Sequence, residues 1–128
     1  MTVRDIQEIL HATVLTGEAL LDTPVEAAFG ADLMSDVLAF VKQKTVLITG
    51  LINLHVVRTS EMLDIRCIVF SRGKQPGEDI LEEAEEAGIA VLSTKMTTYT
   101  CCGELYTRGL PGVQEREDYI RHSAGLKG

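Results

Sequence analysis

Short continuous hydrophobic runs alternate with amphipathic stretches along most of the chain. Three runs are expected to be strands: Thr45–Thr49, Cys67–Phe70 and Ile89–Leu92. Each precedes a stretch expected to be a helix: Leu51–Leu63, Glu78–Ala87 (closed by Gly88) and one near Thr98–Arg108 (ended by Gly109 and Pro111). This alternation is typical of an α/β fold with a mostly parallel sheet, helices on both faces and repeated βα units.

The first part of the chain adds more elements to this pattern. A helix is predicted from an N-cap at Thr2 through Leu10, with Asp5 completing the cap. Three more elements are expected after this helix. They are two short segments, Thr13–Leu15 and Val25–Gly30, placed as strands, and the helix Leu33–Lys42 with Asp32 as N-cap. One α/β domain is therefore expected over residues 1–112, followed by a charged tail or short helix over residues 113–128, whereas the order of the strands is not encoded in the pattern.

Length and charge narrow the class of protein. At 128 residues the chain matches the size of one domain. It has 19 acidic and 12 basic residues, hence a net charge of −7, which argues against non-specific nucleic-acid binding. Its amino terminus carries charges where a signal peptide needs an apolar run, and no apolar stretch reaches the ~20 residues of a membrane span. A cytoplasmic protein is predicted.

The cysteines favour packing over chemistry. Cys67, Cys101 and Cys102 form no CxxC pair and no even disulfide framework, and Cys67 opens an apolar strand. We expect the three cysteines to act as small packing side chains. A redox role for Cys101 or Cys102 would need a lowered pKa of its thiol. Neither a metal site nor a cofactor is indicated, since no ligand spacing is convincing.

Polar turns follow the three strands of the repeated units, at the sheet edge where α/β proteins bind ligands. They span Thr49–His55, Ser71–Gly77 and Ser93–Thr98. The first two are expected to converge on one anion-binding cleft, with these candidate residues: Thr49, Gly50, Asn53, His55, Ser71, Arg72, Gly73 and Lys74. The ordinary alternatives are hydroxyls that cap helices, and a salt bridge from the cations to the Glu82–Glu86 face.

Catalytic motifs are missing from the sequence. Neither GxxxxGK[ST] nor GxGxxG occurs, and His11, His55 and His122 are scattered, without the partners of a triad. No catalytic residue is assigned, and a non-enzyme is predicted. A small phosphotransfer enzyme using His55 or Ser35 remains as an alternative.

The segment Leu51–Leu63 also bears on assembly. Its apolar positions exceed one buried stripe: Leu51, Ile52, Leu54, Val56, Val57, Met62 and Leu63. A homodimer interface would cover the second side, and the protein's own sheet is the alternative cover.

Three segments together resemble the DRTGG domain family: GADLMSDVLAF, TVLITGLINLHVVRTSEMLDIRCIVFSRGKQP and VLSTKMTTYTCCGELYTRGLPG. The resemblance covers Ile6 to Gly112, although the five-letter string that names the family is absent. Many members read Thr-x-x-x-His-x-Asn after the corresponding strand, whereas this chain has Thr49, then Asn53 and His55, which leaves the equivalence of His55 in doubt.

The resemblance implies a regulatory role. Such domains are accessory modules in some phosphate acetyltransferases and lie beside CBS domains in some inorganic pyrophosphatases. They are similar to the non-catalytic amino-terminal domain of HPr kinase/phosphorylase, and stand-alone forms are encoded near iron-only hydrogenase and sensor-kinase genes. The family has no agreed activity or catalytic residues, and it implies a homodimer. We therefore expect a non-catalytic regulatory or ligand-sensing domain in hydrogenase or redox metabolism, with a redox or signalling protein partner. The alternative is a module that binds a small anion or nucleotide.

Overall fold

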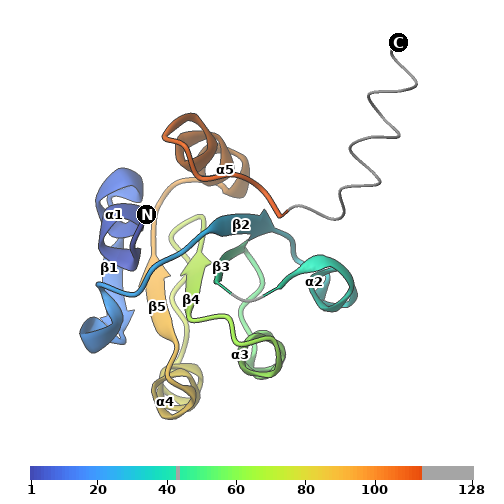
Figure 1. Cartoon of the computed structure of the whole chain (residues 1–128). Helices are drawn as coiled ribbons and strands as arrows, with labels where there is room; N and C mark the ends of the chain where they lie inside the picture. Colours follow the sequence, from blue (N-terminus) through green and yellow to red (C-terminus); the bar gives the residue numbers. More distant parts are fainter. Residues whose placement is uncertain (43, 114–128) are drawn as a thin grey trace.

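The chain forms a five-stranded sheet covered by helices on both faces (Figure 1). This computed structural model describes residues 1–42 and 44–113. The strands are β1 (Thr13–Thr16), β2 (Ala27–Gly30), β3 (Thr45–Thr49), β4 (Cys67–Phe70) and β5 (Ala90–Ser93). The helices are α1 (Val3–Leu10), α2 (Met34–Phe40), α3 (Leu54–Met62), α4 (Glu78–Ala87) and α5 (Thr98–Thr107), with a short 3-10 helix, η1 (Glu18–Leu20).

The strands lie in the order β1-β5-β4-β3-β2. Strands β2 to β5 are parallel neighbours in chain order, and β1 pairs with β5 in the antiparallel direction. The predicted α/β class, with a mostly parallel sheet made of βα units, is therefore confirmed. The antiparallel edge strand brings the start of the chain beside the end of β5.

Alternate residues of the central strands separate two cores. Ile48 and Val69 pack in the core beneath α1 and α5, whereas Leu47 and Ile68 pack in the core beneath α2, α3 and α4. Figure 1 shows these two groups of helices on opposite sides of the sheet. The central strands are buried on both faces, which explains why they appear in the sequence as continuous apolar runs.

A neighbouring segment covers one edge of the sheet. Strand β1 forms the edge next to β5, whereas at the other edge the segment after α5 bridges to β2, where the Ala28 N–H donates to the Pro111 carbonyl at 2.9 Å. A covered edge has few free backbone groups with which another chain can pair.

Two helix ends follow the predicted caps. At the start of α1, the Thr2 hydroxyl accepts from the Asp5 N–H, and the Asp5 carboxylate accepts from the Thr2 N–H, so the capping box is complete. Gly88 ends α4 with φ of +74°, the left-handed conformation that glycine adopts readily.

Two other helix starts were predicted wrongly. Helix α2 begins at Met34 with Leu33 as N-cap, because the Asp32 carboxylate binds the turn after β3 instead. Helix α3 begins at Leu54 rather than Leu51, because Asn53 caps it and accepts from the Val56 N–H.

The apolar residues near α3 serve mainly the protein's own core. Val56 and Val57 are buried, and four partly buried residues pack against the same core: Leu51, Ile52, Leu54 and Leu63. Met62 is 75% exposed. The protein's own fold therefore covers most of the surface for which a dimer was considered.

The predicted carboxyl-terminal tail or helix, apart from Val113, lies outside the described residues. Within the described part of the chain, no helix is long and apolar enough to cross a membrane.

Candidate functional site

The turns after β3 and β4 lie side by side at the carboxyl edge of the sheet. Thr49 and Phe70, the last residues of the two strands, are partners in the parallel pair. The Ser71 N–H continues this pairing by donating to the Thr49 carbonyl at 3.0 Å. The convergence of the first two polar turns follows directly from this pairing.

The turn after β3 is built around the Asp32 carboxylate. One of its oxygens, Oδ1, accepts from the Thr49 hydroxyl and from the Gly50 N–H, each at 2.9 Å. The Thr49 hydroxyl in turn accepts from the Leu51 N–H at 3.1 Å. These bonds join the ends of β2 and β3 and hold Gly50 in a fixed, buried position.

The Arg72 side chain lies directly over Gly50. A Cβ atom added to Gly50 would come within 2.8 Å of Arg72 Nη2 and 3.2 Å of its Nε, so only glycine leaves room for the guanidinium in this position. Arg72 is exposed, and it forms no ion pair with any described residue. The acidic face of α4 does not neutralise it, since Glu83 pairs with Arg58 instead.

The turn that carries Arg72 has an unusual backbone. Arg72 and Gly73 have φ of +62° and +69°, and the Lys74 N–H donates to the Ser71 carbonyl at 3.3 Å, as in a type I′ turn. A positive φ at a residue other than glycine costs on the order of 1 kcal/mol. Hydrogen bonds at 2.7 Å from the Arg72 and Gly73 N–H groups to the segment after β5 hold this conformation.

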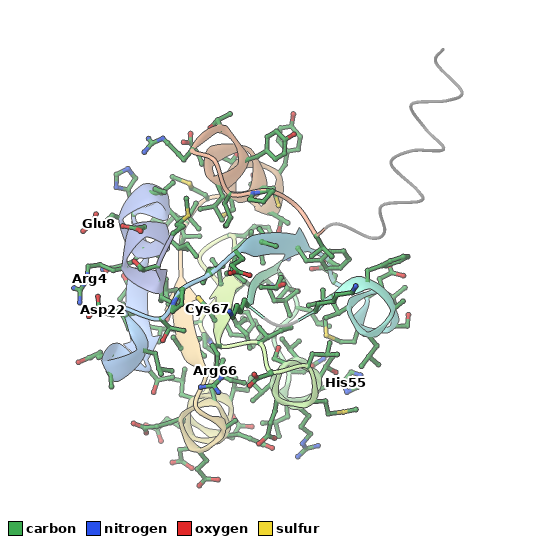
Figure 2. All side chains as sticks on the ribbon, in the orientation of Figure 1. Arg4, Glu8, Asp22, His55, Arg66 and Cys67 are labelled. Atoms are coloured by element: carbon green, nitrogen blue, oxygen red, sulfur yellow. The ribbon has the colours of Figure 1, made fainter. Side chains whose placement is uncertain are left out.

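The other candidate residues have structural partners or stand apart. Asn53 caps α3, and Ser71 is buried with its hydroxyl 2.7 Å from that of Thr98. His55 is exposed on α3 (Figure 2). Ser35 is exposed on α2, and neither side chain has a hydrogen bond among the described residues. The structure thus assembles Thr49, Gly50 and Arg72, with Lys74 exposed on the same turn.

Two residues of this edge were not recognised in the sequence as part of the site. Asp32 was interpreted as a helix cap, and Thr98 as the start of α5, but each reaches a turn on another strand. Asp32 is 17 residues from Thr49, and Thr98 is 27 residues from Ser71. An aspartate just after an expected strand is a weak signal for such a cross-turn contact.

The cysteines have the environment of packing residues. Cys67 lies on β4 inside the molecule (Figure 2), and burial raises the pKa of its thiol to about 12. Burial, followed by the charge of Cys102, raises the pKa of Cys101 to about 11, and burial raises the pKa of Cys102. Thiols with raised pKa values are protonated near neutral pH and react slowly. Among the described residues, no three potential ligands form a metal-binding group.

Comparison with known proteins agrees with this architecture. The family model of the DRTGG domain matches residues 5–106. No match was found among curated protein sequences. A similar solved structure comprises the CBS and DRTGG domains of the regulatory region of Clostridium perfringens pyrophosphatase, complexed with its activator, diadenosine tetraphosphate.

That structure aligns with a TM-score of 0.69 and 18% identity, over 91% of this chain and 51% of the other, so the chain spans about half its length. The shared fold accords with the match of the family model over residues 5–106, which shows that the chain belongs to the DRTGG domain family.

Proposed function

We propose that the chain is a non-catalytic regulatory domain that senses a small anionic ligand at the turns after β3 and β4. Membership of the DRTGG family supports this role. The similar pyrophosphatase structure belongs to a regulatory region and was determined with a nucleotide activator, which is itself a polyanion. The proposed ligand-binding residues are Thr49, Gly50, Asn53, His55, Ser71, Arg72, Gly73 and Lys74.

The exposed Arg72 is the observation that carries the proposal. A chain of net charge −7 offers many carboxylates, yet this guanidinium pairs with none among the described residues. One oxygen of the nearby Asp32 carboxylate already accepts hydrogen bonds from Thr49 and Gly50. A guanidinium without an ion-pair partner can bind a phosphate or carboxylate through two parallel hydrogen bonds.

The non-catalytic part rests on the separation of reactive groups. Catalysis of phosphoryl or acyl transfer needs a nucleophile, an activating base and a group that stabilises developing charge. Exposed His55 and Ser35 lack hydrogen-bonding partners in the described part of the chain, so nothing favours the phosphotransfer alternative. We expect ligands to bind without turnover.

Replacing Arg72 and Lys74 together by alanine tests the site. In a thermal-shift screen of nucleotides and acyl phosphates, a ligand of the native protein should raise the melting temperature, since it stabilises only the folded state. The double variant should lose this shift, and ligand recovered from the native protein should be chemically unchanged. If no compound stabilises the native protein, or both proteins respond equally, the site is wrong.

We propose in addition that the domain acts as a cytoplasmic homodimer in the regulation of hydrogenase or redox metabolism. The resemblance to stand-alone members of the family is the support for this setting. The proposed partner is a redox or signalling protein, and its affinity for the domain should change when the ligand binds.

A further inference from the structure

A second cleft lies at the carboxyl end of β5, on the far side of the turn that carries Arg72. Because β1 is antiparallel, Thr13 pairs with Ser93, and the end of α1 comes beside the end of β5. The cleft has a volume of about 460 Å³, within the range of small-molecule sites. Its walls include His11, Thr13, Gln75, Ser93, Lys95 and Met96.

The charge of this cleft opposes that of the molecule. Its lining contains His11 and Lys95 and no carboxylate among the described residues. Three other clefts among the described residues each contain at least one carboxylate: Glu18 and Glu85 in one, Asp5 and Glu8 beside Arg108 in another, and Asp64 beside Lys44 and Arg66 in the third. A cleft whose lining contains a lysine and no carboxylate favours an anion over a cation, even in a protein of net charge −7.

Hydrogen bonds hold the walls of the cleft in place. The buried Thr94 hydroxyl donates to the Leu10 carbonyl at 2.7 Å, and the Ser93 hydroxyl donates to the Lys74 carbonyl at 3.0 Å. The first bond also satisfies one of the free carbonyls at the end of α1. The cleft is therefore formed before any ligand arrives, which lowers the entropic cost of binding.

The neutral lining residues suit a planar ring. Met96 is half-buried, and methionine packs well against aromatic rings. The Gln75 amide offers both a donor and an acceptor to the edge of a heterocycle. A ligand that uses both the ring-binding side and the cations has an aromatic heterocycle joined to an anionic group.

We propose that this cleft binds a nucleoside monophosphate, with the phosphate between His11 and Lys95 and the base against Met96 and Gln75. This proposal rests on the proposed function, because both have the domain sense an anion. It differs in placing the ligand at another binding site and in naming the class of ligand. Arg72 lies over Gly50, so it is not part of this cleft.

Calorimetric titration of the whole chain with the four common ribonucleoside monophosphates tests the proposal. At least one should bind with one-to-one stoichiometry, at least about tenfold more tightly than its nucleoside or inorganic phosphate alone. Lys95→Glu should weaken it at least about tenfold without changing the melting temperature of the free protein. Lys42→Glu is the matched control. It makes the same charge change on an exposed lysine just before β3, at the amino ends of the parallel strands, and should leave the affinity unchanged.

Other outcomes separate the two proposals. Loss of nucleotide binding on replacing Arg72 and Lys74, with no effect of Lys95→Glu, would overturn the cleft and leave the proposed function standing. Equal binding of inorganic phosphate and nucleotide would overturn the ring-binding part and hence the assignment. If none of the four nucleotides binds, the assignment of the cleft is wrong. Binding of an acyl phosphate that depends on Arg72 would still support the proposed function.

Discussion

Two glycines illustrate how differently single positions constrain this molecule. Gly17 has φ of +86°, and an added Cβ would lie 2.5 Å from the backbone Cα of Ala90. At Gly50 the added Cβ would meet only the mobile end of the Arg72 side chain, at 2.8 Å. Backbone cannot move out of the way as a side chain can. The first glycine is therefore needed for the fold and the second for the position of Arg72.

Alanine at each position should give opposite results. Gly17→Ala should reduce the free energy of unfolding by roughly 2–4 kcal/mol, because strain and overlap with Ala90 add together. Gly50→Ala should change stability by less than about 1 kcal/mol but weaken anion binding, because it displaces the guanidinium. Urea unfolding of both variants, with ligand titration of the second, makes the comparison. A Gly50→Ala variant as unstable as Gly17→Ala would show that Arg72 is not free to move.

Sequence reasoning at this scale found the residues of the edge but not their contacts. Arg72 and Gly50 were both candidates, since each follows an apolar run. The bond from Asp32 to Thr49 and the left-handed conformation of Arg72 depend on strands that become neighbours only in the folded sheet. Local spacing carries no information about such contacts.

Helix α1 provides the element whose stability depends most clearly on pH. Two hydrogen bonds lower the pKa of Asp5 below its ordinary value of 3.8. The larger effect comes from the Thr2 backbone N–H and the smaller from the Thr2 side chain. A carboxyl group with a lowered pKa in the folded state stabilises that state above its ordinary pKa. The contribution is lost as the pH falls through the folded value.

Asp5→Asn should therefore destabilise the protein near neutral pH, and the difference from the native chain should disappear below pH 3.8, as the carboxyl of the native chain becomes protonated. Chemical unfolding of both proteins across this range measures the effect. Glu8→Gln, on an exposed carboxylate of the same helix, controls for net charge and should cause no such loss at neutral pH. A difference that stays constant with pH would contradict the assignment.

Elements with strong local signals were predicted well. Strands β3 and β4 have the predicted bounds, and α4 begins and ends where its charges and Gly88 indicated. The start of α3 was misplaced because Leu51 and Ile52 are apolar, as helix residues are, while they serve a turn that packs on the core. Apolar character alone does not separate these two uses.

At the scale of the whole molecule, assembly is the property to measure. We expect a homodimer of about 28 kDa, twice the 14.0 kDa chain. Several large apolar side chains on or next to three helices stay exposed in the single chain: Leu33, Leu38, Met62, Tyr99 and Tyr106. An interface would remove such side chains from water. Multi-angle light scattering gives the mass directly, and a particle of 14.0 kDa at every concentration would rule the dimer out.

The global arrangement explains why the second cleft was beyond sequence reasoning. His11 and Lys95 are far apart in the sequence, and only the antiparallel pairing of β1 with β5 brings them to one cleft. The alternating pattern predicts the repeated units, but it does not predict the side on which the first strand joins them.

The pairing of β1 with β5 also orders events during synthesis. Thr13 leaves the ribosome 80 residues before its partner Ser93, since 93 − 13 = 80. At roughly 5–20 residues per second, the first strand waits for several seconds while the intervening βα units emerge. Those units pair with neighbours made just before them, so they can assemble as translation proceeds. The amino-terminal segment can pair with β5 only after β5 has emerged, and the nascent domain carries an open β5 edge until it does.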